Sequence, residues 1–110
     1  MNRSLVIACL LLSAGVASAA QVTGNLRDGG RAVGAGVAVI VNCDADEYRG
    51  STDQFGSYSV FVPREGRCAL AVEYQGQRTG GFEIYSYSDP VKYDFDLVRA
   101  GNGTYSLTRR

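Results

Sequence analysis

The chain has 110 residues, enough for one small domain, and its 11 basic and 11 acidic side chains give a formal net charge of zero. Histidine is absent, which excludes acid–base catalysis by that side chain near neutral pH. The basic residues form no stripe, so phosphate-directed binding of nucleic acid is excluded as well.

Residues 1–20 have the pattern of a secretory signal peptide. Arg3 supplies a positive start, residues 5–12 form an apolar run, and Ala-Ser-Ala at 17–19 forms a small-residue cleavage site. The run is shorter than the ~20 residues that a membrane-spanning helix requires, so we predict no transmembrane span. Residues 21–110 are then the mature domain of an exported protein, periplasmic or secreted.

Two alternatives remain within this segment. The sequence allows cleavage after Ala19 or after Ala20. Residues 6–9 also resemble a bacterial lipoprotein box, which would make Cys9 a lipidated N-terminus. Because the apolar run continues past Cys9, we expect cleavage and not lipid attachment.

The mature chain keeps two cysteines, Cys43 and Cys68. In an exported protein an even pair predicts one disulfide. A domain of this size buries only about 60 to 65% of its unfolded surface, so a cross-link worth about 3 kcal/mol would be a substantial contribution to its stability. A metal site is the alternative, but no histidine and no Cys-x-x-Cys spacing completes a ligand set, so we predict none.

Short apolar segments separated by turn residues about every eight to twelve positions predict an all-β sandwich of seven or eight antiparallel strands. Residues 21–26 are expected to form a first strand at a sheet edge, followed by an Asp-Gly-Gly turn at 28–30. Residues 35–43 are almost all apolar and predict a central strand. One face of that strand carries Val37, Val39, Val41 and Cys43, and the other carries Ala38 and Ile40.

An acidic turn at 44–47 and a short strand at 48–52 are expected next. A polar turn closed by Gly56 then leads into a strand in which Tyr58, Val60 and Val62 share one face. The turn predicts a positive φ at Gly56, because glycine adopts that conformation without steric cost.

Residues 67–74 predict a strand whose buried face holds Cys68, Leu70, Val72 and Tyr74. Both cysteines therefore project with the buried side chains of their own strands, which allows a bond between the two strands without establishing their separation. Turns at 75–77 and 79–81 lead to a strand at 82–87 with large side chains on both faces.

The clearest alternation in the chain follows Pro90. Val91, Tyr93, Phe95 and Leu97 are expected in the core, opposite a solvated face of Lys92, Asp94 and Asp96. Gly-Asn-Gly at 101–103 predicts a hairpin with a primed turn, and residues 104–108 return with Tyr105 and Leu107 inward.

Several of these residues give the chain a resemblance to a known family. They are Val22 and Gly24 in the first strand, Gly-Ala-Gly-Val at 34–37, the turn motif Thr52, Asp53, Gly56 and Tyr58, and the apolar strand after Gly66. This part, roughly residues 21–75, resembles the carboxypeptidase regulatory-like domains of the transthyretin-like (prealbumin-like) sandwich superfamily. The resemblance implies a Greek-key sandwich, and residues 85–110 resemble the tail of small exported bacterial members.

An enzyme branch of this superfamily, the hydroxyisourate hydrolases, ends in Tyr-Arg-Gly-Ser, which occurs here at 48–51. In that branch the tetrapeptide is C-terminal and works with histidines, whereas here it is internal and the chain has none. We therefore expect no catalytic residue and no enzymatic activity.

Two other chemistries remain as alternatives. Four carboxylates within residues 44–53 are close enough to act as paired glycosidase acids or calcium ligands, although Arg49 stands where a calcium loop needs glycine. A solvated acidic turn is the simpler interpretation. An isopeptide bond from Lys92 to Asn25 or Asn42 would need an inward lysine, and Lys92 is expected to face outward.

The tyrosines favour a binding function. At a sheet edge, Tyr85 and Tyr87 would face water beside Arg78 and Asp89. We expect a non-enzymatic interaction or structural module of the bacterial cell envelope, which binds another envelope protein through an edge strand or a loop end. The alternative is a carbohydrate-binding module that uses the exposed tyrosines. Neither function requires a cofactor.

Overall fold

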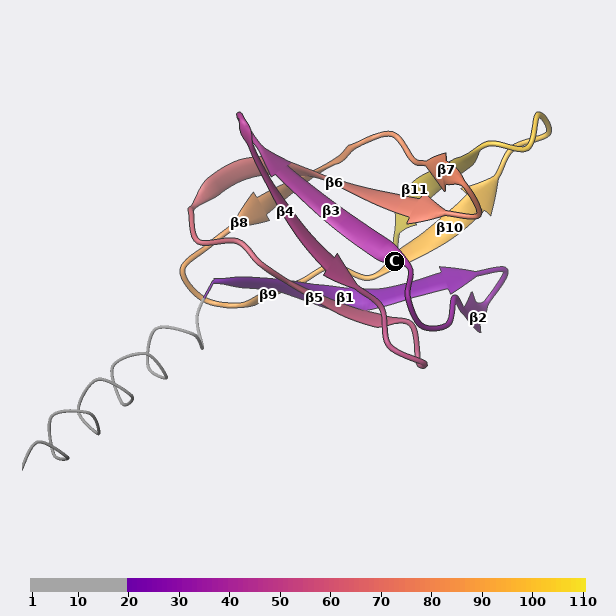
Figure 1. Ribbon diagram of the computed structural model, residues 1–110, viewed down its shortest axis with the longest axis horizontal. Coiled ribbons are helices and arrows are strands. Elements are labelled where there is room, and N and C mark those ends of the chain that lie inside the picture. Colours follow the sequence, from indigo (N-terminus) through magenta and orange to yellow (C-terminus); the bar gives the residue numbers. More distant parts are fainter. Residues whose placement is uncertain (1–19) are drawn as a thin grey trace, which may run out of the picture.

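The computed structural model describes residues 20–110, which form an all-β domain of two packed sheets (Figure 1). The expected signal peptide and Cys9 lie outside these residues, except for Ala20. The strands in this part of the chain are β1 (Gln21–Asp28), β2 (Arg31–Ala32), β3 (Ala38–Cys43), β4 (Asp46–Ser51), β5 (Ser57–Phe61), β6 (Gly66–Tyr74), β7 (Gln77–Arg78), β8 (Phe82–Ser86), β9 (Val91–Lys92), β10 (Phe95–Arg99) and β11 (Tyr105–Arg109). Eight of them have five or more residues, as predicted, and β2, β7 and β9 are two-residue additions.

The first sheet has the order β11-β10-β1-β2, with β5 and β9 also paired to β1. The second sheet has the order β4-β3-β6-β7, with β8 also paired to β6. Most neighbours are antiparallel, but β1 runs parallel to β9 and β10. The predicted fold class is therefore confirmed, with two parallel pairings that the sequence did not indicate. In the described residues, no helix has the length and apolar character to span a membrane.

The prediction that the first strand lies at a sheet edge is wrong. β1 is flanked by β5 along residues 21–25 and by β9 and β10 on its other side, so it lies in the middle of its sheet. Val22 and Leu26 are fully buried, while the alternate residues are only partly covered. That alternation shows which face is buried, but it carries no information on how many neighbouring strands the backbone pairs with.

The core fills the space between the two sheets, with β3 and β6 as central strands of the second sheet. Cys43 at the end of β3 and Cys68 in β6 are almost fully buried and form a disulfide, with their Cα atoms 4.5 Å apart. The predicted bond is confirmed, and it joins neighbouring strands of one sheet. On the outer face of that sheet, Ile40 is also completely buried.

A close approach between β1 and the last third of the chain interrupts the predicted strand at 91–97. A Cβ atom on Gly24 would lie 1.7 Å from the Tyr93 carbonyl oxygen, so only glycine allows this contact. Asp94 does not lie on a solvated face as predicted. Its carboxylate accepts the Asn25 N–H at 2.9 Å and so replaces a backbone acceptor between β9 and β10.

The hairpin at 101–103 forms where predicted, but its turn is different. Asn102 has no positive φ, whereas Gly103 has a φ of 88° and its N–H donates to the Ala100 carbonyl at 2.9 Å. This is the three-residue hairpin loop in which a glycine in the left-handed region follows the turn. The primed turn occurs instead at Gln75 and Gly76, whose φ values are 50° and 77°.

Candidate functional site

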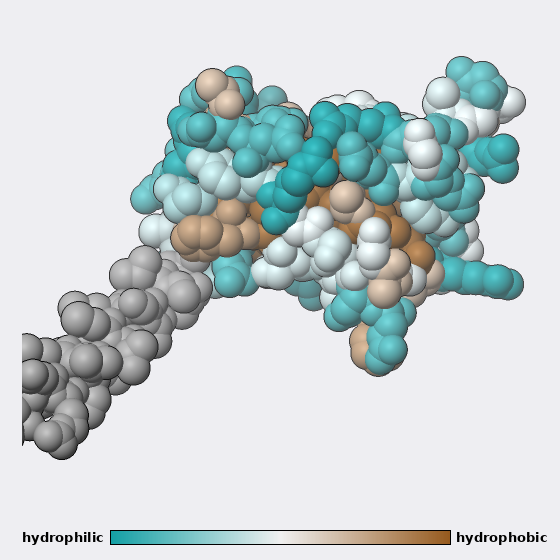
Figure 2. Space-filling model, viewed as in Figure 1, coloured by the Kyte–Doolittle hydropathy of each residue, from teal (hydrophilic) through white to brown (hydrophobic). Residues whose placement is uncertain are grey.

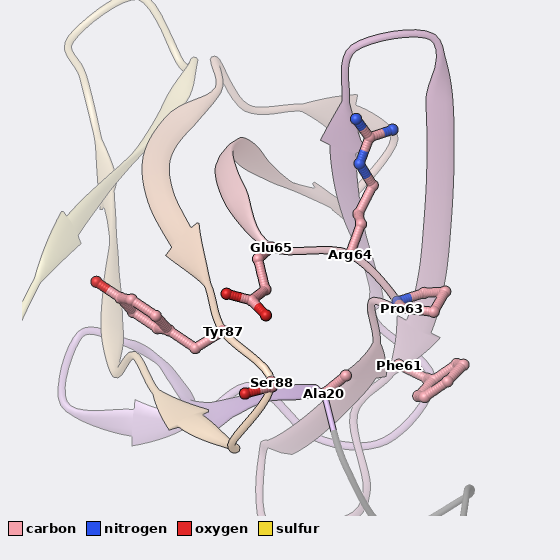
Figure 3. Close-up of a pocket in the computed structure, with 7 residues that line it drawn as sticks. All are labelled: Ala20, Phe61, Pro63, Arg64, Glu65, Tyr87 and Ser88. Atoms are coloured by element: carbon pink, nitrogen blue, oxygen red, sulfur yellow. The ribbon is translucent and has the colours of Figure 1, made fainter.

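A hollow of about 420 Å³ opens at one end of the sandwich (Figure 3). Its lining residues are Ala20, Phe61, Pro63, Arg64, Glu65, Tyr87 and Ser88. They come from the segment before β1, from the connection between β5 and β6, and from the loop after β8. In the space-filling view, apolar surface gathers at the left end of the molecule and along the seam between the sheets (Figure 2).

Backbone hydrogen bonds hold these three segments together. The Val62 N–H donates to the Ala20 carbonyl at 2.8 Å, and the Ala20 N–H donates to the Ser88 carbonyl at 2.9 Å. Ala20 therefore forms a bridge between the end of β5 and the loop after β8. The hollow has a fixed floor, because each of the three segments is bonded to its neighbour.

Two charged side chains border the hollow, and they differ in their partners. The Arg64 guanidinium points away from it (Figure 3), towards Asp44 Oδ2 at 2.8 Å and Asp46 Oδ2 at 2.9 Å. Glu65 is exposed, and within residues 20–110 it takes part in no ion pair. Its carboxylate lies between Tyr87 and Ala20 in the close-up.

Three exposed aromatic rings surround this end of the sandwich. Phe61, Tyr85 and Tyr87 have exposed fractions of 44%, 40% and 49%. The rings of Tyr85 and Tyr87 stack with centroids 6.0 Å apart and an interplanar angle of 28°. We call these three residues, together with the hollow, the aromatic end. β8 pairs with β6 on one side only, so its tyrosines meet the edge-strand condition that the sequence analysis set for exposure.

The free backbone edge of β8 is closed by a side chain from the other sheet. Tyr93 Oη accepts the Tyr85 N–H at 3.0 Å and contacts the Tyr85 carbonyl at 3.4 Å. The Arg109 guanidinium lies 4.4 Å from the centre of the Tyr93 ring, in a cation–π arrangement that helps to hold this ring in place. The position of Tyr85 is thereby fixed at its backbone while its ring stays exposed.

The structure separates the other two residues of the predicted ligand surface. Arg78 lies on β7 opposite Glu73 and forms an ion pair with it at 3.2 Å, whereas Tyr85 lies opposite Arg67 at the other end of β6. Asp89 is an exposed loop residue two positions after Tyr87. Arg67, paired with Glu83 at 3.3 Å, is therefore the basic neighbour of the tyrosines.

Sequence reasoning missed Phe61, Glu65 and Arg67. Phe61 could have been found from the alternation of β5, because it is a large apolar residue on the outward face of a strand whose inward face is already occupied. Glu65 and Arg67 carried no such signal. Their role depends on which strands and loops lie side by side, and local patterns do not reveal that.

The predicted turn motif is structural throughout. Thr52 Oγ1 donates to the Gly34 carbonyl at 2.6 Å and accepts the Val37 N–H at 3.0 Å. Asp53 Oδ1 accepts the backbone N–H groups of Phe55 and Ser57 at 2.8 and 3.0 Å. These bonds satisfy polar groups of the turn itself and leave no reactive side chain free.

The other two residues of the motif attach the turn to the sandwich. Gly56 has a φ of 77°, as predicted, and its carbonyl accepts the Leu26 N–H at 2.8 Å. Tyr58 donates its hydroxyl to the Tyr93 carbonyl at 2.6 Å. Burial raises the pKa of Tyr58 well above its usual value, so this hydroxyl stays protonated.

The residues considered for catalysis also have structural partners. In the tetrapeptide at 48–51, Arg49 pairs with Glu47 at 2.7 Å and with Glu73 at 3.6 Å. The Gly50 backbone is packed so closely that a Cβ atom there would lie 2.5 Å from the Ser59 carbonyl oxygen. Lys92 faces outward, as expected, with 68% of its side chain exposed.

The acidic turn at 44–47 is not simply solvated, because Arg64 connects it to the loop between β5 and β6. Its carboxylates therefore face separate partners and do not converge on one point. Within the described residues, no group of three or more metal-ligating side chains is close enough to hold an ion.

No protein-family model matches the chain, and no curated protein is significantly similar to it in sequence.

Proposed function

We propose that the chain is a non-enzymatic module of the bacterial cell envelope that binds another envelope protein at its aromatic end. The observation that carries this proposal is the gathering of Phe61, Tyr85 and Tyr87 around an apolar hollow of about 420 Å³. Contiguous exposed aromatic surface is characteristic of interaction sites, and buried aromatic anchors dominate the affinity of protein interfaces.

Two further observations support this proposal. The polar residues that looked most like a motif, Thr52, Asp53 and Tyr58, are engaged in holding the fold. The buried disulfide between Cys43 and Cys68 fits a protein of an oxidising compartment, either periplasmic or extracellular. Both point to a rigid exported scaffold that presents a surface.

We also propose that the domain belongs to the transthyretin-like superfamily, among the carboxypeptidase regulatory-like domains. Support comes from the two-sheet arrangement and from the turn at Thr52–Tyr58, in which each residue that carried the resemblance makes a specific bond. A solved structure whose strands superpose on those of a member in the same order would test this assignment.

Site-specific photo-crosslinking in the exporting cell tests the binding function. A photoreactive phenylalanine analogue at Tyr87 should yield one predominant cross-linked protein, because Tyr87 borders the hollow. The matched control is the same analogue at Phe55, which is 69% exposed but lies before β5, whereas Phe61 ends that strand at the hollow. The cross-linked protein should also co-purify with the wild-type chain and be lost with Tyr87→Ala. Equal capture from both positions, or none from Tyr87, would contradict the proposal.

A carbohydrate ligand is the second candidate, and the geometry of Tyr85 and Tyr87 favours it specifically. Their rings are exposed and nearly parallel, and the ion pair of Arg67 and Glu83 lies beside them, so apolar faces and polar groups are close together as sugar binding requires. A glycan array and a polysaccharide pull-down test this function. Lack of retention on every glycan, or retention that Tyr87→Ala leaves unchanged, removes it.

A further inference from the structure

We propose that the hollow receives a lysine or arginine side chain of the partner protein, with Glu65 as its counter-charge. This inference rests on the proposed function and specifies the chemistry of the partner at that same site. It is carried by the charge of the hollow, by the shape of its lining and by the way its two charged residues are oriented.

The hollow carries one uncompensated negative charge. Of its two charged lining residues, Arg64 is turned outward and is held by two aspartates, so its charge is neutralised away from the hollow. Glu65 has no basic partner in the part of the chain that the structure describes, and its carboxylate lies between Tyr87 and Ala20 (Figure 3). A cation is therefore the complementary group.

The remaining lining is mainly apolar. Phe61 and Tyr87 lie on opposite sides of the close-up, with Pro63 and Ala20 between them (Figure 3). Lysine and arginine combine a long aliphatic stem with a terminal charge, so the stem can contact these groups while the charge reaches Glu65. The Tyr87 ring adds a cation–π partner on the same side.

Other kinds of side chain fit less well. A purely apolar group would cover the Glu65 carboxylate without giving it a partner, which carries a desolvation penalty. An acidic group would place two negative charges together. The volume of about 420 Å³ lies at the lower end of the range for ligand pockets, so it suits one side chain better than a larger ligand.

Nuclear magnetic resonance titration of the exported, isotope-labelled chain tests this inference with defined probes. The probes are three acetylated and amidated tripeptides, Ala-Lys-Ala, Ala-norleucine-Ala and Ala-Glu-Ala, which differ in charge at one side chain. The lysine peptide should shift the amide signals of Glu65, Tyr87 and Ser88 most strongly. Its binding should weaken as salt is added, because the ion pair is partly exposed.

Two matched variants identify the carboxylate. Glu65→Gln keeps the shape of the side chain and should weaken binding of the lysine peptide roughly two- to fivefold, which is the range for a partly exposed ion pair. Glu83→Gln is the control, since Glu83 is a similarly exposed carboxylate that is already paired with Arg67 outside the hollow. It should leave that binding unchanged.

Equal binding of the lysine and norleucine peptides, or no effect of Glu65→Gln, would overturn the inference. The proposed function fails by a different result, which is the loss of selective cross-linking at Tyr87. If Tyr87 still captures one partner while Glu65→Gln has no effect on either peptide or partner binding, the module binds proteins but the cation site is wrong.

Discussion

Gly56 shows how a single residue fixes a turn to the sandwich. Its backbone has a φ of 77°, and an added Cβ atom would lie 2.7 Å from the Leu26 carbonyl oxygen. Two separate penalties therefore apply to any larger residue, one from the left-handed conformation and one from the contact with β1.

Gly56→Val should lower the free energy of unfolding by about 2 to 4 kcal/mol, because a β-branched residue meets both penalties. Urea denaturation followed by circular dichroism measures this change. Gly101→Ala is the matched control, since it also lies in a turn but has open space around it and no positive φ. A Gly56→Val variant as stable as the wild type would contradict the role of this turn.

Tyr58 illustrates a second residue whose environment has a measurable consequence. Its hydroxyl is buried and bonded to the Tyr93 carbonyl, and desolvation raises its pKa in the folded chain. When the pH rises above about 10, the unfolded chain releases this proton while the folded chain retains it. The folded state then binds more protons than the unfolded state, so stability must fall as pH increases.

Tyr58→Phe should reduce that fall in stability, because phenylalanine has no proton to lose. At pH 8 the same variant should be less stable than the wild type by about 1 kcal/mol, since the Tyr93 carbonyl loses its donor. Chemical denaturation of both proteins between about pH 8 and pH 11 measures the two effects. Parallel stability curves over this range would show that Tyr58 is not the titrating group.

At the scale of strands, the disulfide joins β3 and β6 across the central pair of the second sheet. The two cysteines are 25 positions apart, so the cross-link closes a loop that contains β4 and β5. A loop of that length corresponds to about 3 kcal/mol of stabilisation through the entropy of the unfolded chain.

Replacing Cys43 and Cys68 together with alanine should therefore lower the melting temperature by more than about 10 °C for a domain of this size. Calorimetry measures the shift, and the reduced wild-type protein provides the comparison without a change in sequence. Equal melting of oxidised and reduced protein would show that the bond contributes nothing to stability.

The edge of β8 depends on a contact between the sheets. Tyr93 Oη takes the place of a neighbouring strand by bonding to the Tyr85 backbone. Tyr93→Phe should accelerate hydrogen exchange of the Tyr85 amide at least about tenfold, because a lost bond of about 1.4 kcal/mol changes local opening by that factor. The Leu70 amide, in a central strand, should be affected much less. Unchanged exchange at Tyr85 would mean that its N–H is protected by something else.

Side-chain alternation predicted most of the individual strands correctly. The buried faces of β3, β5 and β6 were readable because each places apolar residues at every second position. The break between β9 and β10 was not, because it arises from contact of Tyr93 with Gly24, about seventy positions earlier in the chain. Asp94 looked solvated for the same reason, since its backbone partner Asn25 is equally remote.

For the whole molecule, the fold class could be predicted from turn spacing, and the disulfide from the number of cysteines. The candidate site could be predicted only in part. Tyr85 and Tyr87 were found because aromatic residues on both faces of one strand are unusual. Arg78 was assigned to them wrongly, since closeness in sequence across a turn does not place it at the same end of β6.

The assembly of the aromatic end explains why the rest of it was missed. Phe61, Glu65, Tyr87 and Ala20 come from three separate segments, which meet only once the sheets have packed. No local pattern marks such a convergence. It is a property of the topology, in which the chain entry to β1 lies between the end of β5 and the loop after β8.

The double backbone bond of Ala20 gives the export step a structural consequence. Of the two cleavage positions that the sequence allows, the one before Ala20 leaves both bonds and the floor of the hollow in place. The one after it removes them together and frees the Ser88 carbonyl. A protease that moved its cut by one peptide bond would thus decide whether the mature protein has a recess or an open notch.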